Sequence, residues 1–485
     1  MSLLQLQPAA LWRHFQTLCD TPRPSGHEQA LRSLLIEWAQ ARGLCSEVDE
    51  AGNLLIRKAA TPGMEDRPGV ILQGHLDMVA QANADTPHNF VTDPIRTRIE
   101  DGWVHAQGTT LGADNGMGVA AALAVLESDD IAHGPLEALF TIEEESSMRG
   151  ALELRPNWLQ GSLLLNLDSE DRGEVYVGCA GGVDVNCQRS FAQASVPADW
   201  QGVRLSLKGL RGGHSGLDIH KGRGNANRLL VRLLLAALEQ APLRLHSFSG
   251  GTLRNALPRE AFAELVLPQD ALDELQSLVA HYQQLYLAEL GDVEPKLQLQ
   301  LELQSSPSQA LSDTASLQML QLLDAAPHGV ERMSPHFTGV VETSNNLGVV
   351  RLQQGEFSAC LMVRSLRDSA TLALAHRIRS LFQLGGCEVA METPYPGWTP
   401  NPQSQLLTLF QQVHAQQFGK EADVKVIHAG LECGIIGAIY PELDMVSFGP
   451  IIRGAHSPDE RVHIESVQDF WQTLVSLLAA IPAKS

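Results

Sequence analysis

The sequence has few basic residues and no cluster of them. Lysine and arginine number 35 against 56 aspartates and glutamates in 485 residues, which gives a formal net charge of −21 at pH 7. A polyanion of this kind repels nucleic acid and anionic membrane surfaces unless it carries a basic patch. We therefore expect neither nucleic acid nor a membrane as a partner.

Paired cysteines are also absent, since the seven cysteines are scattered and never spaced as C-x-x-C. This excludes a disulfide framework and a thiolate zinc site, and it is typical of a reducing compartment. The amino terminus lacks a basic stretch followed by an apolar one. The longest apolar stretches, such as 118–126, are far shorter than the roughly 20 residues that cross a bilayer. These absences predict a cytoplasmic protein.

The order of apolar segments predicts an α/β sheet domain that an inserted α+β domain interrupts. At roughly 150 residues per domain, the length corresponds to two or three domains. Short apolar runs such as 70–72, 136–142 and 163–167 alternate with helix-like segments, which is typical of buried strands with helices on both faces. This pattern stops near residue 182 and returns after a proline-rich segment at 394–402. The predicted ranges are 1–181 and 398–485 for the sheet domain and 182–397 for the inserted domain.

Acidic residues and histidines follow the apolar runs of the sheet domain, namely His75, Asp77, Asp114, Glu143, Glu144, Glu145, Asp168 and His456. Imidazole and carboxylate groups bind zinc and similar cations, and strand ends in α/β sheets bring such groups together. Asp77 lies two residues after His75 on an extended segment, so it faces the same side and can brace the imidazole. Each residue alone has an ordinary structural alternative, such as a helix cap for Asp114. Their joint placement favours a metal site.

Five longer motifs extend the pattern over nearly the whole chain: Val70–Val79, Gly108–Gly116, Lys208–Gly216, Gly250–Ala256 and His428–Gly434. In these motifs the sequence resembles the aminoacyl-histidine dipeptidase family (peptidase D, cytosolic non-specific dipeptidases) of the two-zinc exopeptidase superfamily. The resemblance implies a catalytic sheet domain with an inserted lid domain. It also implies two Zn²⁺ per chain, with Co²⁺ or Mn²⁺ as possible substitutes.

The resemblance assigns a role to each candidate in the sheet domain. His75 and Asp168 would hold one cation, Glu145 and His456 the other, and Asp114 would bridge both. Glu144 would be the general base, and Asp77 would orient His75. Adjacent residues of an extended segment face opposite sides, so Glu144 and Glu145 need a local bend to serve one site. Glu143 is a third acid that either perturbs Glu144 or simply faces water; we favour the second.

The inserted domain contributes three further candidates through the same resemblance. His214 would donate a hydrogen bond to the oxyanion of the reaction, and Asn255 and Arg364 would bind the carboxylate of the substrate. Composition alone offers other interpretations, namely a flexible glycine-rich turn around His214 and a surface ion pair of Arg364 with Asp368. Whether His214 acts within its own chain or from a partner subunit of a possible homodimer stays open.

The predicted function is hydrolysis of the peptide bond of unblocked dipeptides, including Xaa-His (carnosine-like) substrates. The resemblance implies a hydroxide that bridges the two metals and a glutamate base. An N-acyl amino acid deacylase, a tripeptidase and a non-catalytic binding relative are the alternatives. The partner expected is thus a small peptide, and the preferred amino-terminal residue of that peptide stays open.

Overall fold

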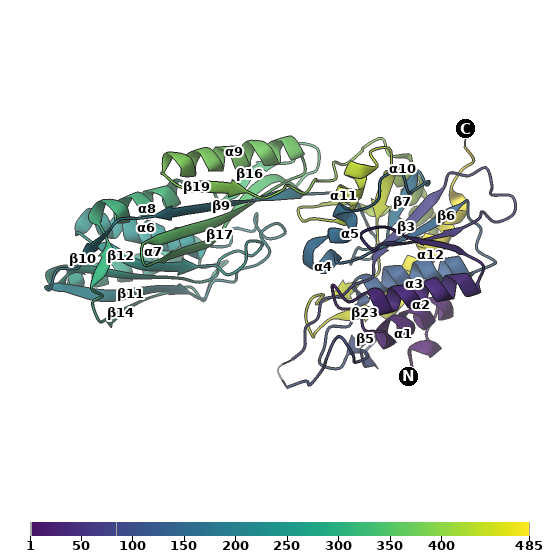
Figure 1. Cartoon of the computed structure of the whole chain (residues 1–485), viewed down its shortest axis with the longest axis horizontal. Helices are drawn as coiled ribbons and strands as arrows, with labels where there is room; N and C mark the ends of the chain where they lie inside the picture. Colours follow the sequence, from purple (N-terminus) through teal and green to yellow (C-terminus); the bar gives the residue numbers. More distant parts are fainter. Residues whose placement is uncertain (1, 84, 485) are drawn as a thin grey trace. The chain divides into compact units, whose positions relative to one another are not determined.

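A computed structural model describes residues 2–83 and 85–484, which form two compact units (Figure 1). The first unit consists of residues 1–178, 398–426 and 431–485, and the second of residues 179–397 and 427–430. The domain ranges predicted from the sequence differ from these units at residues 179–181 and at the segment 427–430. In the described part of the chain, no helix combines the length and the apolar composition that crossing a membrane requires.

The first unit is built on an eight-stranded sheet in the order β1-β2-β6-β3-β7-β21-β8-β20. Its strands are β1 (Cys45–Val48), β2 (Leu54–Lys58), β3 (Val70–His75), β6 (Leu136–Thr141), β7 (Leu163–Asn166), β8 (Glu174–Cys179), β20 (Asp423–Ile427) and β21 (Asp444–Ser447). Strands β6, β3, β7 and β21 are parallel neighbours. Every residue of β3 and β6 is buried, as expected of parallel strands covered on both faces. Their carboxyl ends therefore meet at one edge.

Helices cover both faces of this sheet, with α1, α2 and α3 on one side and α10 and α11 on the other (Figure 1). They are η1 (Leu3–Gln5), α1 (Ala9–Asp20), α2 (Gln29–Ala41), α3 (Ala113–Glu127), α4 (Glu144–Ser147), α5 (Arg149–Leu152), α10 (Gln405–Phe418), α11 (Glu432–Ile439) and α12 (Ile464–Ala480). A four-stranded sheet of β4 (Thr97–Glu100), β5 (Trp103–Ala106), β22 (Ile452–Arg453) and β23 (Arg461–His463) completes the unit. The α/β class predicted from the sequence is confirmed.

The second unit is an α+β unit with a nine-stranded sheet, in which β16 pairs only with β17 beside the main path of strands. Its strands are β9 (Gly181–Ser190), β11 (Trp200–Lys208), β12 (Arg244–Gly250), β13 (Ala261–Pro268), β14 (Gln298–Gln304), β16 (Gly329–Met333), β17 (Val341–Gln353), β18 (Glu356–Ser365) and β19 (Glu388–Met391). Strands β10 (Gln193–Ser195) and β15 (Gln309–Leu311) pair separately. The helices are α6 (Ala226–Gln240), η2 (Gln269–Ala271), α7 (Leu272–Leu290), α8 (Asp313–Ala325) and α9 (Asp368–Leu384).

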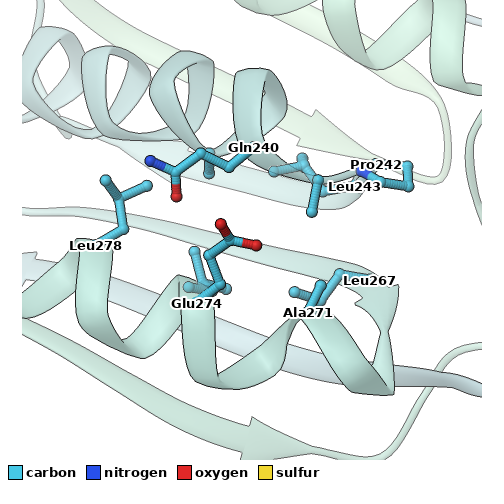
Figure 2. Close-up of a pocket in the computed structure, with 10 residues that line it drawn as sticks. Gln240, Pro242, Leu243, Leu267, Ala271, Glu274 and Leu278 are labelled. Carbon is cyan, nitrogen blue, oxygen red and sulfur yellow. The ribbon is translucent and has the colours of Figure 1, made fainter.

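One hydrophobic core joins the helices and the sheet of this unit. Leu230, Leu233, Leu234 and Ala237 bury one stripe of α6, because residues three and four apart share a helix face. A cavity of about 10 Å³ remains between α6 and α7, where Gln240 and Glu274 point toward one another (Figure 2). A space of this size holds at most one water molecule, so α6 and α7 are closely packed at this point.

Candidate metal centre

Imidazole and carboxylate groups converge at the carboxyl edge of the parallel strands. His75 is the last residue of β3, Asp168 follows β7, and Asp114 lies in the first turn of α3. The possible ligand atoms of these three residues lie within 4.8 Å of one another, and the same holds for Asp114, Glu145 and His456. The structure thus brings together the five side chains that the sequence predicts as metal ligands.

Asp114 belongs to both groups, and its two oxygens face different histidines. Its Oδ1 lies 3.1 Å from His75 Nε2, and its Oδ2 lies 3.3 Å from His456 Nε2. His75 Nε2 also lies 3.6 Å from Asp168 Oδ1, and His456 Nε2 lies 3.0 Å from Glu145 Oε2. The two three-residue groups share the Asp114 carboxylate, so this carboxylate could serve one cation in each group.

The bend that Glu144 and Glu145 require occurs at Glu143, whose φ of 52° is in the left-handed region. Helix α4 begins directly after this residue, so its first two side chains leave the strand direction of β6. Possible ligand atoms of Glu144 and Glu145 lie within 4.8 Å of each other and of His75. Glu143 itself forms an ion pair with Arg149, at 2.6 Å between Oε1 and Nη2.

Asp77 is fully buried and holds two parts of the site together. Its Oδ1 lies 3.3 Å from His75 Nδ1, and its two oxygens accept the backbone N–H groups of Glu144 and Glu145 at 3.0 and 3.1 Å. Ser25 donates a further hydrogen bond to Oδ2 at 2.7 Å. The carboxylate therefore anchors the first turn of α4. Asp77 contacts the imidazole both through this carboxylate and through its backbone O, which lies 3.2 Å from His75 Nδ1.

The electrostatics of the cluster favour bound cations. Hydrogen bonds to Asp114 and Glu145 raise the pKa of His456 to about 11. Burial raises the pKa of Asp168 to about 7, and burial together with nearby carboxylates raises the pKa of Glu144 well above its ordinary value. Buried carboxylates are unfavourable unless they are paired or coordinate metals. The two imidazoles cannot neutralise the carboxylates of the cluster, namely Asp77, Asp114, Glu144, Glu145 and Asp168. This charge fits divalent cations.

Two buried charged residues form hydrogen bonds with the backbone around Asp114. The sequence analysis selected neither of them. Glu460 is 2% exposed and accepts four backbone N–H groups, from Leu111 through Asp114, at 2.7–3.2 Å. Burial raises the pKa of Glu460 to about 7, while these N–H groups act in the opposite direction. Arg23 is 1% exposed and donates to the carbonyls of Leu76, Asp77 and Gly112 at 2.6–2.9 Å. In the sequence these two residues look like ordinary surface charges, because their burial becomes visible only in the folded structure.

A row of polar side chains lies on the strands just before the proposed ligands: Gln73 is two residues before His75, and Asn166 is two residues before Asp168. Gln73 and Asn166 face each other across β3 and β7, and the Asn166 amide donates to Gln73 Oε1. Gln73 and Thr141 each donate a hydrogen bond of 2.6 Å to Glu432 Oε2. Glu432 is fully buried, and burial raises its pKa to about 7. The sequence signal for Glu432 was its place in the motif His428–Gly434, which did not indicate a role.

The three candidates of the second unit lie in adjacent segments of that unit. His214 pairs with Ala256 in an isolated bridge, and Ser215 N donates to Asn255 O at 2.8 Å. Arg364 Nε donates to Ser215 Oγ at 3.3 Å. His214 Nδ1 accepts the N–H groups of Gly216 and Leu217 at 3.2 and 3.1 Å. A neutral imidazole that accepts at Nδ1 carries its proton on Nε2, as a hydrogen-bond donor to an oxyanion requires.

Arg364 does not form the surface ion pair that composition offered as its alternative role. Its side chain is 4% exposed, and across residues 2–83 and 85–484 no ion pair joins it to a carboxylate. Asp368 instead accepts the backbone N–H of Gly397 at 2.9 Å. The second unit therefore contains a buried guanidinium without an anionic partner of its own.

Comparison with known proteins gives consistent matches over nearly the whole chain. The model of "Peptidase family M20/M25/M40" matches residues 71–480. The chain is 48% identical over 482 residues to the cytosol non-specific dipeptidase of Escherichia coli (strain K12), covering 99% of both chains. A crystal structure of aminoacylhistidine dipeptidase from Vibrio alginolyticus is similar with a TM-score of 0.90 and 45% identity, over 100% of this chain and 99% of that one. A tripeptidase from Staphylococcus aureus, at 17% identity and a TM-score of 0.56 over 98% and 99%, shares the fold.

Proposed function

The chain belongs to peptidase family M20/M25/M40, and from this membership we propose that it hydrolyses unblocked dipeptides, including Xaa-His substrates, with two divalent cations. The substrate class rests on two relatives, at 48% and 45% identity, which are named as dipeptidases. The tripeptidase similarity supports only the fold, so a tripeptidase or deacylase activity is the weaker candidate. The name of the Escherichia coli relative also supports our proposal that the protein is cytoplasmic.

The shared carboxylate of Asp114 is the observation that carries this proposal. We assign His75 and Asp168 to one cation, Glu145 and His456 to the other, and Asp114 to both. Mixed nitrogen and oxygen donors suit zinc, although cobalt and manganese accept the same ligands. When bound, a pair of such cations activates a water molecule and polarises the substrate carbonyl.

Glu144 has the properties of the proton carrier in this reaction. Its carboxylate lies beside the ligand groups, where it can take a proton from water and return it to the leaving amine. Glu145, one residue further along α4, faces His456 at 3.0 Å and serves as a ligand. The bend at Glu143 lets these two adjacent glutamates face one site.

The second unit supplies groups that recognise the substrate rather than the cations. We assign the Nε2 proton of His214 to the oxyanion that develops at the scissile carbonyl. Arg364 and Asn255 are assigned to the carboxylate at the carboxyl end of the dipeptide, because a guanidinium binds a carboxylate through two parallel hydrogen bonds. A buried guanidinium without an anionic partner is the observation that supports this assignment.

The test combines metal analysis with hydrolysis assays of the full chain. We expect about two zinc ions per chain, hydrolysis of carnosine in preference to acetyl-histidine and a tripeptide, and loss of activity on chelation. Glu144→Gln should keep both metals and lose about 10²–10⁴-fold in kcat, the usual contribution of a general base. Glu143→Gln is the matched control. Preference for acetyl-histidine, or full activity of Glu144→Gln, would contradict the proposal.

A further inference from the structure

We propose that Tyr395 is a positioning residue that orients the Arg364 guanidinium toward the carboxylate of the substrate, and so sets the specificity for a free carboxyl terminus. The inference rests on the proposed function, in which Arg364 binds that carboxylate. Tyr395 lies in the proline-rich segment 394–402, outside every motif that the sequence analysis selected.

Two hydroxyl groups hold the buried guanidinium in place. Arg364 Nη1 donates to the Tyr395 hydroxyl at 2.9 Å, and Nε donates to Ser215 Oγ at 3.3 Å. These bonds use two of the five guanidinium N–H groups, and the described residues accept none of the other three. Because two neutral hydroxyls fix the guanidinium plane without neutralising its charge, the remaining N–H groups are directed and available for a ligand anion.

Tyr395 is itself held firmly by Gly182. Their backbones exchange two hydrogen bonds of 3.0 Å, from Gly182 N to Tyr395 O and from Tyr395 N to Gly182 O. Gly182 is also the residue directly opposite Arg364 in the pairing of β9 with β18. A Cβ atom at position 182 would lie 2.6 Å from the tyrosine hydroxyl, so the absence of a side chain there lets the phenol ring reach Arg364. The backbone thus fixes the distance between the hydroxyl and the guanidinium.

Removing only the Tyr395 hydroxyl changes the orientation of the Arg364 guanidinium without changing its charge. In Tyr395→Phe the guanidinium keeps its charge and its Ser215 contact but loses one of its two fixed acceptors. We expect KM for carnosine to rise about tenfold, the size of a lost hydrogen bond to a charged group, with kcat within about twofold. Carnosine amide, which has no carboxylate, should bind the variant and the wild-type enzyme equally. The amide is measured both as a substrate and as a competitor, so that slow turnover does not hide its binding.

Tyr286→Phe is the matched control, because Tyr286 is a buried tyrosine of the same unit whose hydroxyl donates to Leu229 O at 2.6 Å. It should leave the ratio of acid to amide affinity unchanged. Equal losses for carnosine and its amide in Tyr395→Phe would overturn the inference. Arg364→Ala tests separately whether Arg364 binds the carboxylate, as opposed to whether Tyr395 orients Arg364. If that variant changes the acid-to-amide ratio and Tyr395→Phe does not, only the role of Tyr395 is wrong; if neither changes it, the assignment of Arg364 is wrong as well.

Discussion

Replacing Glu460 with glutamine tests whether buried charges outside the proposed ligand set hold Asp114 in place. Oε2 of Glu460 accepts the N–H groups of Leu111 and Gly112, and Oε1 accepts those of Ala113 and Asp114. The amide oxygen of glutamine can accept one of these two pairs of N–H groups, but its NH₂ group would face the other pair and cannot accept a hydrogen bond from it. Hydrogen bonds to charged groups contribute about 1.5–3 kcal/mol each. Losing two such bonds corresponds to a decrease of about 3–6 kcal/mol in the free energy of unfolding. Relaxation of the loop that carries Asp114 makes the decrease smaller.

Part of this loss should appear as weaker cation binding, because the same loop carries Asp114. We expect Glu460→Gln to bind zinc 10–100-fold more weakly, the usual effect of losing a residue that supports a ligand. The assay is competition for zinc between metal-free protein and a chelating dye, together with thermal unfolding of the metal-free protein. Glu465→Gln is the control, since the Glu465 side chain is 66% exposed and pairs with Arg172. A Glu460→Gln variant that binds zinc like the wild-type protein would refute this reasoning, even if it unfolds at a lower temperature.

Two further predictions concern carboxylates beside the proposed catalytic groups. Glu143 pairs with Arg149, which lowers the pKa of Glu143, so Glu143→Gln should leave kcat within about twofold in steady-state assays; a large loss would show that it acts on Glu144. Asp218 accepts the backbone N–H of His214 at 2.8 Å. Although burial raises the pKa of Asp218, its hydrogen bonds to the Lys221 side chain and to this backbone N–H lower it below its ordinary value. Its stabilising effect should therefore be complete above the unfolded value of about 3.9 and decrease as the pH falls through the lowered pKa. Denaturant unfolding of wild type and Asp218→Asn should converge below about pH 4, and a constant difference from pH 7 to pH 3 would contradict this.

Much of the fold and of the candidate site could be predicted from local sequence alone. Apolar runs predict buried strands, and the residues that follow a parallel strand must lie at the carboxyl edge of its sheet. This reasoning is sufficient to select His75 and Asp168 as neighbours at that edge. It could not bring Glu144 and Glu145 to one site, because that depends on the left-handed conformation of Glu143, which no spacing rule indicates.

The sequence by itself determined the fold class and which side chains follow which strands, because both depend on short-range periodicity. Only the tertiary structure decided which oxygens of Asp114 face which histidine, and which further buried charged residues lie beside the site. Glu460 and Leu111 are 349 positions apart in the chain, and Glu432 and Gln73 are 359 apart. A carboxylate acquires such a role only when folding removes it from water and surrounds it with N–H and O–H donors, since a solvated glutamate has no fixed partner.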